Sequence, residues 1–104
     1  MKILFATNIV TRIVGLLPYR QEAEAIYFLL PTCKKVHTFF MRHPIHVIFL
    51  DKNVHVLEIQ KNLTPWNNSR TVPGVDSILE ILPGKNDDGL EGLSELLEQI
   101  KKNR

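Results

Sequence analysis

The stretch PIHVIFLDKNVHVLEIQ, residues 44–60, decides the fold, because it is the clearest strand–turn–strand pattern in the chain. Two runs rich in branched residues, 45–50 and 54–60, flank the polar turn Asp51-Lys52-Asn53. This composition is typical of a β-hairpin. Both alternating faces of the first run are mostly apolar, so we expect that strand to lie in the middle of a sheet, beside a half-exposed partner.

Further strands are predicted on both sides of the hairpin. Upstream, the apolar runs 2–6 and 25–30 are typical of short strands, and residues 36–41 are expected to be extended. Downstream, residues 75–82 have strand character and end at Pro83-Gly84. The sequence therefore predicts five or six strands.

Two helices are predicted, one towards each end of the chain. Apolar residues recur at helical spacing near residues 8–17 and again near 89–102. Asp88 and Glu91 have the spacing of a capping box for the second helix. The whole pattern indicates a single α+β domain, residues 1–104, with a bent, mainly antiparallel or mixed sheet, an N-terminal helix and a C-terminal helix.

Composition narrows the class of protein. The net charge of +2 is too small to indicate nucleic acid by itself. The single cysteine cannot form an intramolecular disulfide, which favours a reducing compartment. The longest unbroken apolar run, 25–30, is far shorter than a membrane span, and polar residues interrupt the N-terminal apolar run. We therefore expect a cytoplasmic protein with no membrane span.

The segment CKKVHTFFMRHPIHVIFLD, residues 33–51, resembles the signature of the uncharacterised bacterial and archaeal DUF192 family. The most specific parts are Val36-His37-Thr38-Phe39, Met41-Arg42 and the run from Val47 to Asp51. Val14-Gly15-Leu16-Leu17 and Ile78-Leu79-Glu80 also fit, so the resemblance covers roughly residues 1–90. It implies a compact, β-rich fold on a barrel-like sheet and no established activity.

The chain departs from the family pattern at several positions. His46 stands where the family commonly has an acid, Phe40 where it often has Gly or Trp, and Asn53 or Val54 where it has a turn glycine. A glutamate-rich helix is expected at the C-terminus, where the family usually continues into a final strand. An imidazole at position 46 cannot replace a carboxylate in a polar site.

The candidate ligand-binding residues come mainly from the family-like motifs, with one added from the polar loop 61–74. They are His37, Met41, Arg42, His46, Trp66 and Glu80. Trp66 is either an exposed interface anchor or a lid folded over the core. A buried Glu80 paired with Arg42 or His37 is an equally good structural explanation for that acid. No catalytic residue is assigned.

Two alternatives remain open beside a binding domain. Cys33 and His37 offer thiolate and imidazole for a metal or metal-dependent enzyme site within residues 33–46, although paired-ligand spacings are absent. Lys34, Lys35 and Arg42, with aromatic residues among them, suggest an anion or nucleic-acid surface.

The favoured interpretation is a small non-enzymatic domain that binds a protein or a small ligand, without a cofactor. The sequence offers no paired carboxylates, phosphate-binding glycine loop or nucleophile motif that would favour an enzyme. Nucleic acid is the less favoured partner. We expect a monomer or a weak dimer, and the half-exposed hairpin offers an edge for pairing with another chain.

Overall fold

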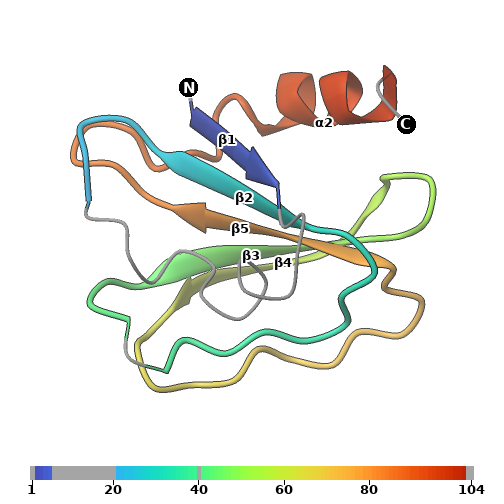
Figure 1. The fold of residues 1–104 in the computed structure, drawn as a ribbon, viewed down its shortest axis with the longest axis horizontal. Helices are drawn as coiled ribbons and strands as arrows, with labels where there is room; N and C mark the ends of the chain where they lie inside the picture. The colour runs from blue at the N-terminus through green and yellow to red at the C-terminus, as the bar shows by residue number, and fades with distance from the viewer. Residues whose placement is uncertain (1, 6–20, 40, 103–104) are drawn as a thin grey trace.

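The computed structural model describes residues 2–5, 21–39 and 41–102. In these ranges a five-stranded sheet has the order β1-β2-β5-β3-β4 (Figure 1). β1 runs parallel to β2, and the other neighbouring pairs are antiparallel. The elements are β1 (Lys2–Phe5), β2 (Ile26–Leu30), β3 (Ile45–Leu50), β4 (Val56–Leu63), β5 (Ser77–Leu82) and α2 (Leu93–Lys102).

The predicted hairpin is confirmed as β3 and β4, and β3 lies between β4 and β5. All residues of β3 and of β5 are buried, whereas β4 is an edge strand that is exposed or half-buried except at Leu63. The central position of β3 follows from its two apolar faces, since only a strand covered on both sides can bury them.

The sheet separates two hydrophobic clusters. Alternate residues of β3 divide between them: Val47 and Phe49 belong to the first cluster, Ile48 and Leu50 to the second. Side chains from the long connections 31–44 and 64–76 complete the first cluster, and α2 completes the second. Figure 1 shows α2 on one side of the sheet and these two connections on the other.

The C-terminal helix is confirmed, but it begins at Leu93 and not near residue 89. The Asp88 side chain accepts the N–H of Leu90 at 2.9 Å in a local turn, so the predicted capping box does not start the helix there. Gly89 has a φ of +84°, and its carbonyl accepts the Tyr27 hydroxyl at 2.7 Å. A Cβ at Gly89 would lie 2.5 Å from the Ile81 side chain, so the turn needs glycine.

Other expectations are corrected or remain outside the described ranges. The barrel-like sheet is not supported, because the order of the described strands leaves β1 and β4 as open edges. The extended segment expected at 36–41 is not a regular strand in its described residues, 36–39 and 41, which make one isolated bridge, His37 to Asn68. The N-terminal helix predicted at 8–17 lies outside the described residues. None of the described helices has the length and apolar character needed to cross a membrane.

Candidate functional site

Thr38 joins the two connections that cover the first cluster. Its side chain is fully buried, and its Oγ1 donates to the Thr64 carbonyl at 2.6 Å and accepts the Asn67 N–H at 3.0 Å. The backbone N–H of Thr38 donates to the Asn67 carbonyl, and its carbonyl accepts the N–H of Trp66 at 3.0 Å. One buried residue therefore holds the loop that carries Trp66, and we call these contacts the Thr38 clamp.

Ser69 adds further hydrogen bonds between the two connections, and its partner is Val36. Its N–H donates to the Val36 carbonyl at 2.9 Å, and its Oγ accepts the Val36 N–H at 3.0 Å. Val36 and Ser69 are both buried, and the residues next to them, His37 and Asn68, form an isolated β-bridge. Buried hydrogen bonds whose donors and acceptors are satisfied make a structure rigid, so the two connections form one ordered surface.

Three aromatic rings lie on this surface, and we call them the aromatic stack. The ring centroids of His37 and Phe39 are 4.7 Å apart with an interplanar angle of 28°. Those of Phe39 and Trp66 are 6.0 Å apart at 25°. Trp66 is 60% exposed and Phe39 37% exposed, so Trp66 is not a lid folded over the core.

The backbone at Trp66 is unusual as well. Its φ of +67° places a bulky non-glycine residue in the left-handed region, a conformation that costs on the order of 1 kcal/mol or more. The Thr38 clamp supplies the hydrogen bonds that hold this conformation. An exposed indole is therefore kept in a strained position by buried contacts beneath it.

Met41 and Arg42 have different environments. Met41 is half-buried against the first cluster and donates its N–H to the Thr38 carbonyl at 3.1 Å, so it supports the clamp. Arg42, Lys34 and Lys35 are exposed, and no ion pair is recorded for them among the described residues. They supply positive charge that is adjacent in sequence to the stack.

Cys33 and His37 do not form a recognisable metal site. Cys33 is half-buried against the first cluster, and its Sγ donates to the Lys35 carbonyl at 3.4 Å. The His37 ring stacks on Phe39, and its Nδ1 accepts the Phe39 N–H at 3.3 Å. Within the described ranges, no three His, Cys, Asp or Glu side chains are placed to hold a metal ion.

Glu80 lies in the middle of β5, on the face of the first cluster. Its neighbours across the sheet are Phe28 on β2 and Val47 on β3, both members of that cluster. Burial raises the pKa of Glu80 from 4.5 to about 8, because a carboxylate there would lose its hydration. No ion pair joins it to Arg42 or His37 in the described part of the chain, so the predicted structural pairing is not seen.

His46 lies on the opposite face of the sheet and is only 4% exposed. Its Nδ1 accepts the backbone N–H of Asn62 at 3.1 Å. Its Nε2 is buried without a hydrogen-bond partner among the described residues. Burial lowers the pKa of His46; Asp88 acts to raise it and Lys61 to lower it further. Sequence reasoning chose this residue for a ligand surface, but the structure places it inside.

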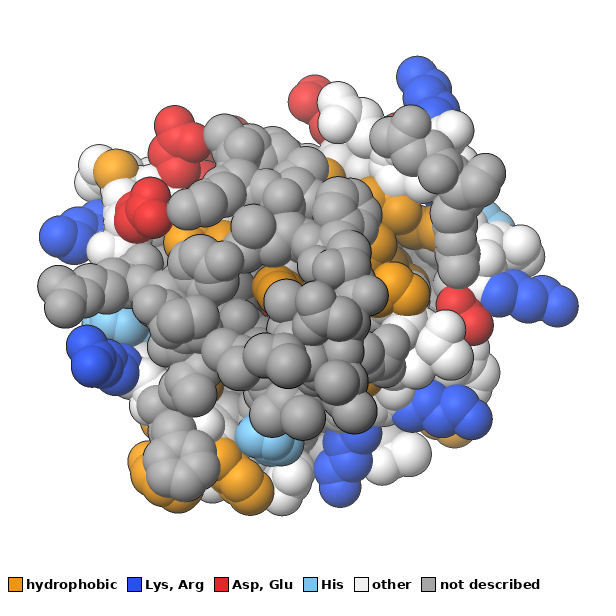
Figure 2. Space-filling view, viewed as in Figure 1, with side chains coloured by type: hydrophobic (Ala, Val, Ile, Leu, Met, Phe, Trp, Pro, Cys, Tyr) orange, Lys and Arg blue, Asp and Glu red, His pale blue; other side chains and the backbone are white. Residues whose placement is uncertain are grey.

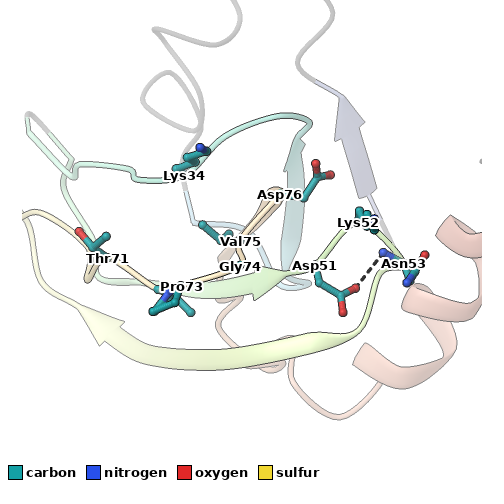
Figure 3. Close-up of a pocket in the computed structure, with 10 residues that line it drawn as sticks. Lys34, Asp51, Lys52, Asn53, Thr71, Pro73, Gly74, Val75 and Asp76 are labelled. Atoms are coloured by element: carbon teal, nitrogen blue, oxygen red, sulfur yellow. Dashed lines mark hydrogen bonds between the residues drawn. The ribbon is translucent and has the colours of Figure 1, made fainter.

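The structure also contains a cleft that sequence reasoning missed, shown in Figure 3. It has a volume of about 600 Å³, and its lining includes Lys34, the hairpin turn 51–53 and the loop 71–76. Asp51 points towards the turn, where its carboxylate accepts the N–H groups of His55 and Asn53; these bonds hold the pKa of Asp51 below its ordinary value. Three segments far apart in sequence build the cleft, so no local motif could reveal it.

Comparisons with known proteins agree with the fold. The profile of the DUF192 family, described as "Uncharacterized ACR", matches residues 1–89. No curated protein matches the chain significantly.

Two crystal structures are similar to the chain. A protein of unknown function from Novosphingobium aromaticivorans DSM 12444 is 20% identical, with a TM-score of 0.60 over 92% of this chain and 67% of that one. A putative transcription regulator from Sinorhizobium meliloti 1021 is 19% identical, with a TM-score of 0.64 over 92% of this chain and 73% of that one. At these identities the likeness concerns the fold alone.

Proposed function

The chain belongs to the DUF192 family, and we propose that it is a non-enzymatic binding domain that recognises a protein partner through the aromatic stack. The observation that carries this proposal is the exposure of Trp66, 60%, above the buried Thr38 clamp. A large indole held outward in a strained backbone conformation does not serve the core. Strain of this kind is commonly found where it supports function.

Preorganisation favours the stack as a contact surface. Binding normally costs free energy for ordering side chains and loops, and a surface that is already ordered avoids part of that cost. The Thr38 clamp orders the loop of Trp66, and mutual stacking orders the rings of His37 and Phe39. Tryptophan is also among the residues that most often dominate interface energetics.

Three positive charges adjacent in sequence to the stack indicate the chemistry of the partner. Lys34, Lys35 and Arg42 are exposed and have no recorded ion pair among the described residues. Charges at the rim of an interface guide association and orientation. We therefore propose a partner segment that places an apolar or aromatic side chain against the stack and carboxylates beside it.

The non-enzymatic part of the proposal rests on the separation of Glu80 and His46, two buried groups whose pKa values are shifted by burial. Glu80 faces the first cluster, whereas His46 faces the second, so the sheet lies between their side chains. Acid–base catalysis needs both groups within reach of one substrate. Neither is placed to act with the other.

Single-stranded nucleic acid is the second candidate, because bases stack on aromatic rings beside basic side chains. The stack and the three exposed cations are the observation that favours it. Against it, Figure 2 shows Lys and Arg as separate groups around the rim of the visible face, without a continuous basic stripe among the side chains coloured there. A groove that follows the phosphate backbone of a nucleic acid normally concentrates positive charge.

Site-specific photocrosslinking tests both candidates in cells. A photoreactive amino acid at Asn68, an exposed position in the loop of the stack, should capture a protein. The same group at Gln99, exposed on α2, is the matched control and should not capture that protein. Capture of nucleic acid at Asn68 would favour the second candidate, and equal capture at both positions would contradict a specific surface.

The substitution Trp66→Asn then tests the role of the indole in the captured complex. Asn tolerates positive φ, so this change removes the ring while the backbone conformation is retained. We expect affinity to fall by at least about tenfold, since anchors of this type contribute roughly 2 kcal/mol or more. The control Leu57→Ala removes another exposed apolar side chain, 41% exposed on β4, and should leave titration calorimetry unchanged. An unaltered affinity for Trp66→Asn would sink the proposal.

A further inference from the structure

A β-bulge interrupts the pairing of β3 and β4 next to the loop that carries Trp66. Ile45 pairs with Leu63 and Val47 with Gln60, so one residue of β3, His46, opposes two residues of β4, Lys61 and Asn62. Asn62 has a φ of +54°. The N–H of Asn62 donates to His46 Nδ1 at 3.1 Å. The buried side chain of His46 thus accepts a backbone N–H of the bulge.

Only the neutral imidazole can make this contact. With Nδ1 as acceptor, the ring proton lies on Nε2. Protonation would turn Nδ1 into a donor that faces the donor N–H of Asn62. It would also place a cation at a position that is 4% exposed, with no partner for Nε2 among the described residues. Both effects oppose the charged ring.

The surrounding charges do not compensate for the cost of burying a protonated His46 ring. Lys61, on β4, disfavours a positive charge on His46, whereas Asp88, in the turn before α2, favours one. The neighbour on β5, Ile81, is apolar. Asp88 is exposed and its Oδ1 already accepts the Leu90 N–H. Burial therefore dominates, and the pKa of the ring is lowered.

The bulge is coupled to the aromatic stack through three consecutive residues. Asn62 is bonded to His46, the next residue, Leu63, is buried in the first cluster, and the carbonyl of Thr64 accepts the Thr38 hydroxyl. Trp66 follows two residues later, held by the Thr38 carbonyl. Release of Asn62 would remove the fixed end from which this loop starts.

We propose that His46 is a proton-operated latch: the neutral ring fastens Asn62 and the loop of Trp66, and acidification releases them. As a regulatory device for the binding surface, this inference rests on the proposed function. The proton comes from solvent and binds Nδ1, and the Asn62 N–H becomes free to bond water. Binding by the aromatic stack is then favoured at neutral pH and weakened in acid.

Trp66 is the only tryptophan of the chain, so its fluorescence reports on the loop directly. The wild-type protein is titrated from pH 7.5 to 4.5 while Trp66 emission, the Asn62 amide signal and the His46 ring signals are followed. We expect one common midpoint below 6.5 for all three. Opening at Asn62, measured by hydrogen exchange corrected for intrinsic rate, should increase by up to about tenfold per pH unit below 6.5.

Two variants distinguish the effect of protonating His46 from the effect of protonating other histidines. His46→Asn retains an acceptor near the position of Nδ1 but cannot titrate, so its Trp66 emission should be independent of pH. His37→Asn removes the ring that stacks on Phe39 and should retain the wild-type change at Asn62. Loss of the transition in His37→Asn with retention in His46→Asn would overturn the latch.

The wild-type titration keeps the test valid if His46→Asn fails to fold. A His46 ring that titrates at or above 6.5, or an Asn62 amide that does not follow it, would overturn the inference. These readouts need no partner, so they stand apart from the proposed function. If the latch operates and crosslinking finds no partner, the binding proposal alone fails.

Discussion

At the scale of single residues, Glu80 and His46 are buried groups whose charged forms are disfavoured by burial. Burial raises the pKa of Glu80 to about 8 and lowers the pKa of His46. The consequences for stability have opposite signs. Below 6.5 the unfolded chain binds a proton that native His46 resists, so this group destabilises the fold as pH falls. Native Glu80 holds a proton that the unfolded chain releases above 4.5, so it destabilises the fold as pH rises.

Between pH 6.5 and 8 Glu80 dominates the pH dependence, because His46 becomes neutral in both states as the pH rises above 6.5. Wild-type stability should fall by up to about 1.4 kcal/mol per pH unit in this window, and the slope should decrease as the pH approaches 8. Glu80→Gln mimics the protonated acid and should abolish the slope, which urea unfolding at several pH values measures. The exposed control Glu98→Gln should keep the wild-type slope. An unchanged slope in Glu80→Gln would mean that the acid is ionised in the native protein.

At the scale of elements, the two connections over the first cluster carry the residues of the proposed binding surface. The described residues of these connections contain no regular strand, and they pair only at the bridge from His37 to Asn68. Their order comes from side chain–backbone bonds of two small buried residues, Thr38 and Ser69. Such bonds let irregular backbone cover a core without orphaned polar groups.

Thr38→Val tests this joining of the two connections. The change keeps the shape of the side chain but removes the donor to Thr64 and the acceptor for Asn67. We expect a loss of roughly 1–3 kcal/mol in unfolding free energy, together with altered Trp66 emission in the native state. The control Thr71→Val removes an exposed hydroxyl outside these contacts and should cost less than about 0.5 kcal/mol. Equal stability of the two variants would contradict the Thr38 clamp.

At the scale of the whole molecule, β3 and β5 contribute to both hydrophobic clusters. Ile78 of β5 belongs to the first cluster, and its neighbour Leu79 to the second. Because each central strand is packed on both faces, loss of either cluster exposes the same strands. The molecule should therefore unfold as one cooperative unit.

Truncation in each cluster tests that cooperativity. Ile78→Ala in the first cluster and Leu96→Ala in the second should each cost about 2–5 kcal/mol, since both side chains are nearly inaccessible. In urea, far-ultraviolet circular dichroism and Trp66 fluorescence should give one coincident transition in both variants. A separate early transition in Leu96→Ala, limited to the helix signal, would show that α2 unfolds independently. The surface control Glu98→Ala should leave the midpoint close to that of the wild type.

The strands were largely predictable because they are local patterns. The alternating runs at 45–50 and 75–82 and the apolar run at 25–30 correspond to β3, β5 and β2, with ends shifted by no more than two residues. The C-terminal helix was predicted from its apolar stripe, but its start was wrong. Gly89 is bonded to Tyr27 across the sheet, and this distant contact delays the helix to Leu93.

The candidate site was predictable only in part. Trp66 and His37 were chosen from sequence, and the structure brings them together through Phe39, which was not. His46 was chosen for a surface and is buried, because a one-residue bulge in β4 turns its ring into an internal acceptor. The bulge has no local signal, since it depends on how two strands pair.

The sequence by itself determined the family, the central hairpin and the α+β class, because motif identity and hydrophobic alternation act over a few residues. Only the tertiary structure decided the open strand order, the aromatic stack and the burial of His46. Each of these depends on contacts between segments separated by more than ten residues, such as Thr38 with Thr64 and His46 with Asn62. Such contacts form only when the packing of the whole chain brings their partners together.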